Sequence, residues 1–412
     1  MAVGNAAELV RKLDELGRVT DVPGELTRTF LSPAMRAASQ LVGSWMSDAG
    51  LSVTTDRIGN LIGRLPGSNS SGKTFVLGSH LDTVRNAGRF DGALGVLLPI
   101  VALADLRRRG VTLPFSVEVV GFSEEEGVRF ASGYLGSKAY CGRLSASDLA
   151  ICDDEGVSVR EVIARWNRNR AVRPPPAAHR RADLLGYLEV HIEQGPVLEK
   201  RNLAVGVVSA IAGQSRFRVR WTGRAGHAGT TPMELRRDAL AGAAEFVLAV
   251  ENLARKTPGL VATVGQIAAQ PGAANVIPGE VGHTLDVRHA GDAMRRKALV
   301  WLGRTAAAIA RRRGLRVAWR RTQDNRATNC SPRLTTLLER VVRARQGRSL
   351  SLVSGAGHDG VVVSSLAPIA MLFIRCRDGL SHHPREHAAP KDLAVGLQVT
   401  IDFLEALARR HS

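Results

Sequence analysis

The sequence has few cysteines, few aromatic residues and no long apolar run, and each shortage excludes a class of protein. Cys141, Cys152, Cys330 and Cys376 form neither a CxxC pair nor a disulfide-dense pattern, so we expect reduced thiols. No stretch reaches the about 18 uninterrupted apolar residues of a membrane span. The start, MAVGNAAELVRKLDELG, predicts an amphipathic helix and lacks the features of a secretion signal, so a cytoplasmic location is the default expectation.

Acidic residues are also scarce. The chain has 38 acidic and 56 basic residues, which gives a net charge of +18 at pH 7. An excess of this size is compatible with a nucleic-acid partner. The arginines are nevertheless spread along the chain, and aromatic residues, the platforms for base stacking, make up only 4% of it. We therefore expect no nucleic-acid partner and interpret the charge as an arginine-rich surface that can attract a small anionic substrate.

The length of 412 residues predicts two domains. Strands and helices alternate in the first part of the chain, which predicts a doubly wound α/β domain with a largely parallel sheet and helices on both faces. The expected strands are 59–65, 74–80, 115–122, 186–192 and 204–211, and the expected helices are 34–48 and 92–109. The polar, proline-rich stretch 166–183 predicts a surface loop.

A different pattern begins near residue 213 and has the strand-helix-strand-strand-helix-strand order of a ferredoxin-like α+β module. Its expected elements are a strand at 216–223, a helix at 232–255, strands at 261–267 and 281–289, a helix at 291–313 and a strand at 315–321. The first pattern resumes near residue 331 and ends with a helix at 391–410. We therefore predict one domain of residues 1–212 and 329–412 with an inserted domain of residues 213–328.

Histidines and carboxylates stand where predicted strands end, the edge at which open α/β sheets place ligands. His80 ends the strand TFVLGSH, and Asp82 can fix its imidazole from behind. Asp91, in AGRFDGALG, either binds a metal or caps the helix that follows. In the run Glu124–Glu126 one carboxylate can bind a metal while its neighbour takes a proton from water, or all three form a solvated acidic turn.

Two further histidines extend this pattern. His191 interrupts an apolar strand and is either a ligand or a satisfied core residue, and His382 follows the apolar strand APIAMLFI. Because strand ends converge on one edge of a doubly wound sheet, we expect these groups to meet. Imidazole and carboxylate without thiolate suit Zn²⁺, Mn²⁺ or Co²⁺, and two ions that share a bridging carboxylate would explain five ligands.

Eight motifs, in order, resemble the di-metal aminoacylase/carboxypeptidase superfamily, and within it the branch of allantoate amidohydrolases and N-carbamoyl-L-amino-acid hydrolases. They are GSHLDT, AGRFDG, EEEGVRF, HIEQGPVLE, GHAGTTPM, NVIPG followed by DVR, SGAGHD and GLSHHPRE. The resemblance covers residues 8–410. Two departures, the Arg-Cys of IRCRDGLSHH and the loop 166–183, lie away from the expected ligands.

By position, the resemblance implies two divalent metal ions bridged by Asp91. His80 and His191 would complete one site, and Glu126 and His382 the other. The metals would be Zn²⁺ or Mn²⁺, with Co²⁺ as a further choice.

The resemblance further implies that Glu125 is the general base and that Asp82 orients His80. The inserted domain would be the lid and dimerisation domain of a homodimer, and its His227 would reach the partner subunit's active site and stabilise the oxyanion. His358 would support the site. The implied substrate contacts are Gln194, Arg216, His227, Asn275, Arg288, Gly355 and Gly357, with the alternatives that Arg288 forms a surface salt bridge and Asn275 a turn.

The implied reaction is hydrolysis of the C–N bond of a ureido or N-carbamoyl group on a small carboxylate. The stretch DTVRNAGRFDGALGV favours allantoate over an N-carbamoyl-L-amino acid as the substrate. His191 followed by EQGP disfavours a peptidase or aminoacylase. Glu125 and the complete ligand set disfavour an inactive binding protein.

Overall fold

The computed structural model describes residues 2–69, 72–168 and 173–411, and the chain divides into two compact units. Unit 1 comprises Met1–Ser209 and Cys330–Ser412, and unit 2 comprises Ala210–Asn329. Unit 2 is therefore an insertion in the sequence of unit 1, with limits at most three residues from those expected.

Unit 1 is built on a mixed sheet. Its strands are β1 (Ser52–Thr55), β2 (Leu61–Leu65), β3 (Thr74–His80), β4 (Ser116–Phe122), β5 (Leu184–Ile192), β6 (Val205–Ile211), β15 (Ser351–Ser354) and β16 (Ile369–Ile374). The short strand β14 (Thr328–Asn329) also belongs to this sheet, although its residues are the last of unit 2. Their order is β1-β2-β4-β3-β5-β16-β6-β14, and β15 pairs with β6. The central strands β4, β3, β5 and β16 are parallel, whereas β1, β2 and β6 pair antiparallel with their neighbours. The expected parallel pairing is thus right for the centre and wrong for the flanks, where a short connection such as that from β1 to β2 permits only antiparallel pairing.

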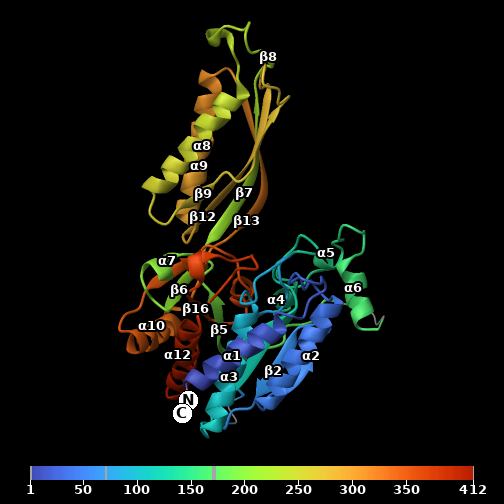
Figure 1. Cartoon of the computed structure of the whole chain (residues 1–412), viewed down its shortest axis with the longest axis vertical. Coiled ribbons are helices and arrows are strands. Elements are labelled where there is room, and N and C mark those ends of the chain that lie inside the picture. The colour runs from blue at the N-terminus through green and yellow to red at the C-terminus, as the bar shows by residue number, and fades with distance from the viewer. Residues whose placement is uncertain (1, 70–71, 169–172, 412) are drawn as a thin grey trace. The chain divides into compact units, whose positions relative to one another are not determined.

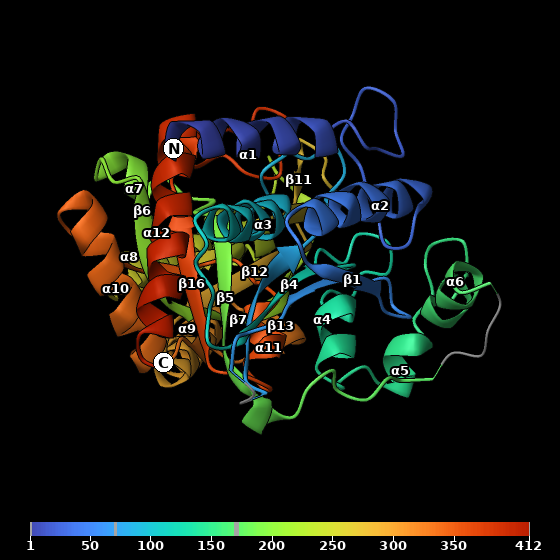
Figure 2. The same cartoon turned by 90° about the horizontal axis from the view of Figure 1, so that it is seen from below.

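Helices cover both faces of this sheet (Figure 2). One face carries α1 (Ala2–Leu16), α2 (Pro33–Asp48), α3 (Ala93–Arg108) and α12 (Pro390–Ala408), and the other carries α4 (Leu135–Tyr140) and α11 (Gly360–Val363). Helix α3 is apolar on nearly all sides because it packs between the central strands and helices α1 and α12. The remaining helices are α5 (Ala146–Leu149), α6 (Val159–Trp166), α7 (Val197–Lys200), α10 (Pro332–Gln346) and the 3₁₀ turns η1 (Arg181–Asp183) and η3 (Arg377–Gly379).

The central strands bring the chemistry to one edge. All seven residues of β3 are buried, as expected for a strand with parallel neighbours and helices on both faces. His80 is its last residue, and His191 is the last but one of the adjacent β5. Glu124 follows the end of β4 by two residues, and His382 lies beyond the end of β16. Asp91 differs from the expected pattern because it lies in the loop before α3.

Unit 2 pairs one antiparallel sheet with two helices (Figure 1). Its strands β7 (Gly213–Thr222), β9 (Val261–Thr263), β10 (Ile267–Gln270), β12 (Glu280–His289) and β13 (Arg316–Asn325) are ordered β10-β12-β7-β13, with β9 also on β12. Helices α8 (Ala239–Lys256) and α9 (Asp292–Arg312) close a core that includes Trp221, Phe246 and Leu302. The other elements are β8 (Gly226–His227), β11 (Val276–Ile277) and the 3₁₀ turn η2 (Met233–Leu235).

Two expected elements of unit 2 differ in the structure. The helix expected from residue 232 begins at Ala239, because the Asp238 side chain accepts the backbone N–H groups of the first turn. The strand expected at 261–267 is split into β9 and β10, which pair with different parts of β12. The order of strands and helices is still that of a ferredoxin-like module.

The expected loop 166–183 contains no strand among its described residues; Trp166 ends α6, Arg181–Asp183 form η1, and residues 169–172 lie outside the described part. All four cysteines are free thiols. Within the described ranges, every helix is too short or too polar to cross a membrane.

Candidate metal centre

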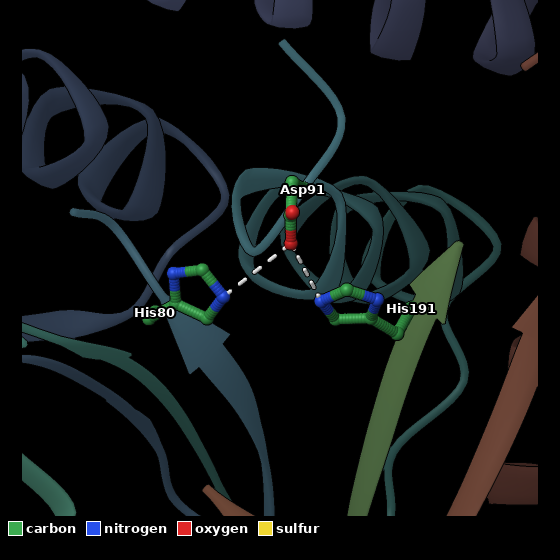
Figure 3. A group of neighbouring side chains, drawn as sticks. All are labelled: His80, Asp91 and His191. Carbon is green, nitrogen blue, oxygen red and sulfur yellow. Dashed lines mark ion pairs between the residues drawn. The ribbon is translucent and has the colours of Figure 1, made fainter. Parts of the chain in front are cut away.

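His80, Asp91 and His191 form the centre of the candidate site (Figure 3). His191 Nε2 lies 3.0 Å from Asp91 Oδ1, and His80 Nε2 lies 3.6 Å from the same oxygen. All three side chains are buried. Two imidazoles that face one carboxylate oxygen form a group able to hold a cation between them.

The second oxygen of Asp91 belongs to another group. His382 Nε2 lies 3.1 Å from Asp91 Oδ2 and 3.7 Å from Glu126 Oε1. The ligand atoms of Asp91, Glu126 and His382 lie within 4.8 Å of one another, as do those of His80, Asp91 and His191. Such spacings fit nitrogen and oxygen ligands that each lie about 2.1 Å from a shared ion. The structure therefore contains two candidate metal groups that share Asp91.

The buried imidazoles of His80 and His191 are each fixed by a hydrogen bond at Nδ1, the nitrogen that does not face Asp91. His80 Nδ1 is 3.0 Å from the main-chain oxygen of Asp82, and His191 Nδ1 is 2.9 Å from that of Ile192. These carbonyls accept the Nδ1 proton and turn Nε2 of each ring toward Asp91, so that loss of the Nε2 proton would leave a lone pair for a metal ion. The Asp82 carboxylate accepts the N–H groups of Glu125 and Glu126 at 3.0 and 3.1 Å. Asp82 therefore connects the acidic loop, residues 124–126, to the end of β3, which carries His80.

The structure contradicts the two alternatives that the sequence left open, a helix cap for Asp91 and a solvated turn for the acidic loop. Gly92, not Asp91, is the N-cap residue of α3, and it has φ +65°. A Cβ at Gly92 would lie 2.4 Å from the His80 imidazole, so only glycine permits this approach. Glu124 is buried, and its carboxylate accepts the N–H groups of Gly127 and Leu135, so the acidic loop is not a solvated turn.

Electrostatics also favour a cation at this position. Burial alone would raise the pKa of Asp91, but hydrogen bonds from His191, His382 and His80 hold it well below its usual range. Burial and the charge of Asp91 raise the pKa of Glu126 to about 7. Burial, with Glu126 beside it, raises the pKa of Glu125 well above its usual range. A divalent cation would favour the ionised form of these crowded carboxylates.

Ser381 and Glu386 hold the Asp91 loop, although sequence reasoning did not single them out. Glu386 is buried, and its Oε1 accepts the N–H groups of Phe90 and Asp91 at 2.9 and 3.1 Å. Ser381 Oγ lies 3.0 Å from Asp91 Oδ2 and 2.9 Å from Glu386 Oε2. Both residues flank His382 in GLSHHPRE, so the other polar positions of that motif were the available signal.

Gln194 lies beside the shared carboxylate. Its Nε2 donates to Asp91 Oδ2 and to Ser381 Oγ, each at 3.1 Å. Its Oε1 is buried and has no hydrogen-bond partner within the described residues. Gln194 and His382 both have left-handed backbones, with φ of +57° and +55°. Strained backbone of this kind concentrates at functional sites.

His358 supports the site from behind. Its ring centroid lies 4.6 Å from that of His191, and its Nε2 is 2.7 Å from Ser354 Oγ. Burial lowers the pKa of His358 well below its usual range, so the ring is neutral. Of the two glycines expected among the substrate contacts, Gly357 lies beside Glu125, since an added Cβ would be 3.8 Å from Glu125 Oε1. Gly355 precedes it by two residues, just after β15.

The expected site residues of unit 2 form two groups. Arg216 Nε and Arg288 Nη2 both bind the Asp286 carboxylate, at 2.9 and 2.8 Å, so Arg288 is in an ion pair as its alternative reading had it. His227 is exposed and lies in β8, which pairs with β11 directly after Asn275. The main-chain oxygen of Asn275 accepts the N–H of Ala228. Substrate contacts by these four residues stay predictions.

The chain is similar to known proteins over nearly its whole length. Residues 76–406 match the model of peptidase family M20/M25/M40. Allantoate deiminase 2 of Glycine max is 38% identical over 97% of this chain and 89% of its own length. N-carbamoyl-L-amino-acid amidohydrolase of Pseudomonas sp. strain NS671 is 40% identical over 96% of both chains. A crystal structure of an amidase of the hydantoinase/carbamoylase family from Burkholderia multivorans is similar, with a TM-score of 0.90 and 33% identity over 97% of both chains.

Proposed function

The chain belongs to peptidase family M20/M25/M40, and from this premise we propose that it is a metal-dependent amidohydrolase of ureido or N-carbamoyl groups. The observation that carries the proposal is the pair of ligand groups that share Asp91 beside Glu125. Relatives of this chain are named as enzymes of allantoate and of N-carbamoyl-L-amino acids at similar identity. The substrate we favour is allantoate, and the alternative is an N-carbamoyl-L-amino acid.

The donor set fits two divalent ions. His80, Asp91 and His191 would hold one ion, and Asp91, Glu126 and His382 the other. Nitrogen and oxygen donors without sulfur suit Zn²⁺ or Mn²⁺, and also Co²⁺. When bound, the ions supply Lewis acidity, which makes water more acidic and polarises the ureido carbonyl.

Glu125 performs the proton transfer. Its buried position raises its pKa, so it can take a proton from the attacking water and return it to the leaving nitrogen. Asp82 keeps the backbone of Glu125 in place through the hydrogen bond from its N–H. Water adds to the ureido carbon, the C–N bond breaks, and the carbamic acid formed decomposes to carbon dioxide and ammonia.

Three side chains are suited to recognise the substrate. The unpartnered Oε1 of Gln194 can accept an N–H of the ureido group. Arg216 and Arg288 offer planar guanidinium groups, which bind carboxylates in a bidentate manner. They share Asp286, so a substrate carboxylate would compete with that residue.

His227 and Asn275 complete the proposed set, with unit 2 as the lid and dimerisation domain of a homodimer. His227 Nδ1 accepts the N–H of Gly229 at 3.0 Å, so Nε2 carries the proton and can donate to a developing oxyanion. Most of the exposed large apolar side chains in the described ranges belong to unit 2, among them Leu248, Val300 and Trp301. A protein surface of this kind favours a protein partner, and a stable monomer in sedimentation would contradict the dimer.

The test is a substrate panel with the metal-loaded protein. Ammonia release is measured from allantoate and from N-carbamoyl-L-amino acids, and acetylated amino acids and dipeptides serve as controls. We expect turnover of the ureido compounds, with allantoate fastest. Faster cleavage of a carbamoyl amino acid would support the alternative, and cleavage of the controls alone would contradict the proposed function.

A further inference from the structure

Tyr134 lies over the loop that carries Glu125. Its N–H donates to the main-chain oxygen of Glu125 at 3.2 Å, and the N–H of Leu135 donates to the buried carboxylate of Glu124 at 3.3 Å. These bonds hold Tyr134 at φ +69°, a left-handed conformation unfavourable for a residue with a Cβ. Gln194 and His382, which contact Asp91, share this strained conformation.

The Tyr134 hydroxyl points to Gly357. A Cβ added at Gly357 would lie 1.9 Å from Tyr134 Oη and 3.8 Å from Glu125 Oε1. The two oxygens are therefore within two hydrogen-bond lengths of each other, close enough for both to contact the same small group. The Tyr134 hydroxyl can occupy this position only because Gly357 has no side chain.

Tyr134 is also distinct among the three tyrosines. Tyr140 Oη donates to Glu118 Oε2 at 3.0 Å, and Tyr187 Oη donates to the oxygen of Gly78 at 2.9 Å. The Tyr134 hydroxyl has no hydrogen-bond partner in the part of the chain that the structure describes, and the residue is only half-buried. Burial, with Glu125 nearby, raises the pKa of Tyr134, so the hydroxyl keeps its proton and remains a donor.

We propose that Tyr134 donates a hydrogen bond to the carbonyl oxygen of the group under attack and stabilises the negative charge that gathers there. The inference rests on the proposed hydrolysis of a ureido or carbamoyl group. Water adds to the carbonyl carbon on the side of Glu125, the carbonyl electron pair moves to the oxygen, and Tyr134 donates to that oxygen without losing its proton. A donor placed for this charge acts mainly in the transition state.

The first test compares Tyr134→Phe with Tyr140→Phe. Both changes remove one hydroxyl from the α4 segment, but only Tyr134 lies next to Glu125. We expect Tyr134→Phe to lower kcat about 10²-fold with little change in KM and with its metal content unchanged. Tyr140→Phe should lower thermal stability and leave kcat unchanged, because its hydroxyl serves Glu118. An unchanged kcat in Tyr134→Phe would overturn the proposal.

The second test measures binding without turnover. The probe is a phosphoramidate analogue in which tetrahedral phosphorus replaces the ureido carbon, and the reaction product is the control ligand. Tyr134→Phe should weaken calorimetric binding of the analogue by the factor lost in kcat/KM and leave product binding unchanged. A merely structural tyrosine would weaken both equally, which would contradict the proposal.

These tests separate the two hypotheses. If the wild-type protein cleaves only acetylated amino acids or dipeptides, the proposed function fails. The Tyr134→Phe comparison is then made on that substrate, because an amide carbonyl develops the same charge, and its kcat still decides the role of Tyr134.

Discussion

Substitutions of Glu386 test how the loop of Asp91, the carboxylate shared by the two candidate metal groups, is held in position. Its Oε1 accepts the N–H groups of Phe90 and Asp91, and its Oε2 contacts Ser381. Glu386→Ala leaves both N–H groups buried without an acceptor. Glu386→Gln keeps an oxygen for both of them and removes only the charge, so the pair of variants separates hydrogen bonding from electrostatics.

The two variants should differ by several kcal/mol. Each buried N–H left without a partner costs about 1–3 kcal/mol, so Glu386→Ala should lower the free energy of unfolding by about 2–6 kcal/mol. Glu386→Gln should change it by less than about 1 kcal/mol, since Ser381 can turn its hydroxyl toward Asp91 and the repulsion between Glu386 and Asp91 disappears. A displaced Asp91 should also weaken metal binding about 10- to 100-fold in Glu386→Ala.

Urea unfolding of metal-free protein measures the first effect, and calorimetric titration with Mn²⁺ measures the second. The comparison is made between the two variants at equal protein concentration. If Glu386→Ala unfolds at the same urea concentration as Glu386→Gln, the two N–H groups do not depend on Glu386 and the reasoning is refuted.

Two further predictions concern the base and the first turn of α3. Glu125→Gln should keep its metal, measured by mass spectrometry, and lose about 10²-fold or more in turnover, because no proton acceptor remains; near-wild-type turnover would contradict the assignment. Gly92→Ala should lose metal, because its Cβ would lie 2.4 Å from the His80 ring. Gly110→Ala is the matched control, since it also has a positive φ but meets nothing within 4 Å. Equal metal content in the two alanine variants would sink the steric argument.

The candidate metal-binding side chains could be brought together from the sequence because strand periodicity and chemistry agree. The central strands are largely apolar, and the histidines and carboxylates at their ends or just beyond them lie at one edge of the sheet. His80 and His191 meet at Asp91 for this reason. The flanks of the sheet were harder to predict, because short edge strands carry no periodicity that distinguishes parallel from antiparallel pairing.

The sequence by itself determined the fold class, the insertion of unit 2 and the residue types available as ligands, since these follow from local patterns and motif order. Only the tertiary structure decided which residues support them. Glu386 reaches the Asp91 backbone across 295 residues of sequence, and the Tyr134 hydroxyl has its place because Gly357 lacks a side chain. Such contacts depend on the packing of distant segments, and no local periodicity records them.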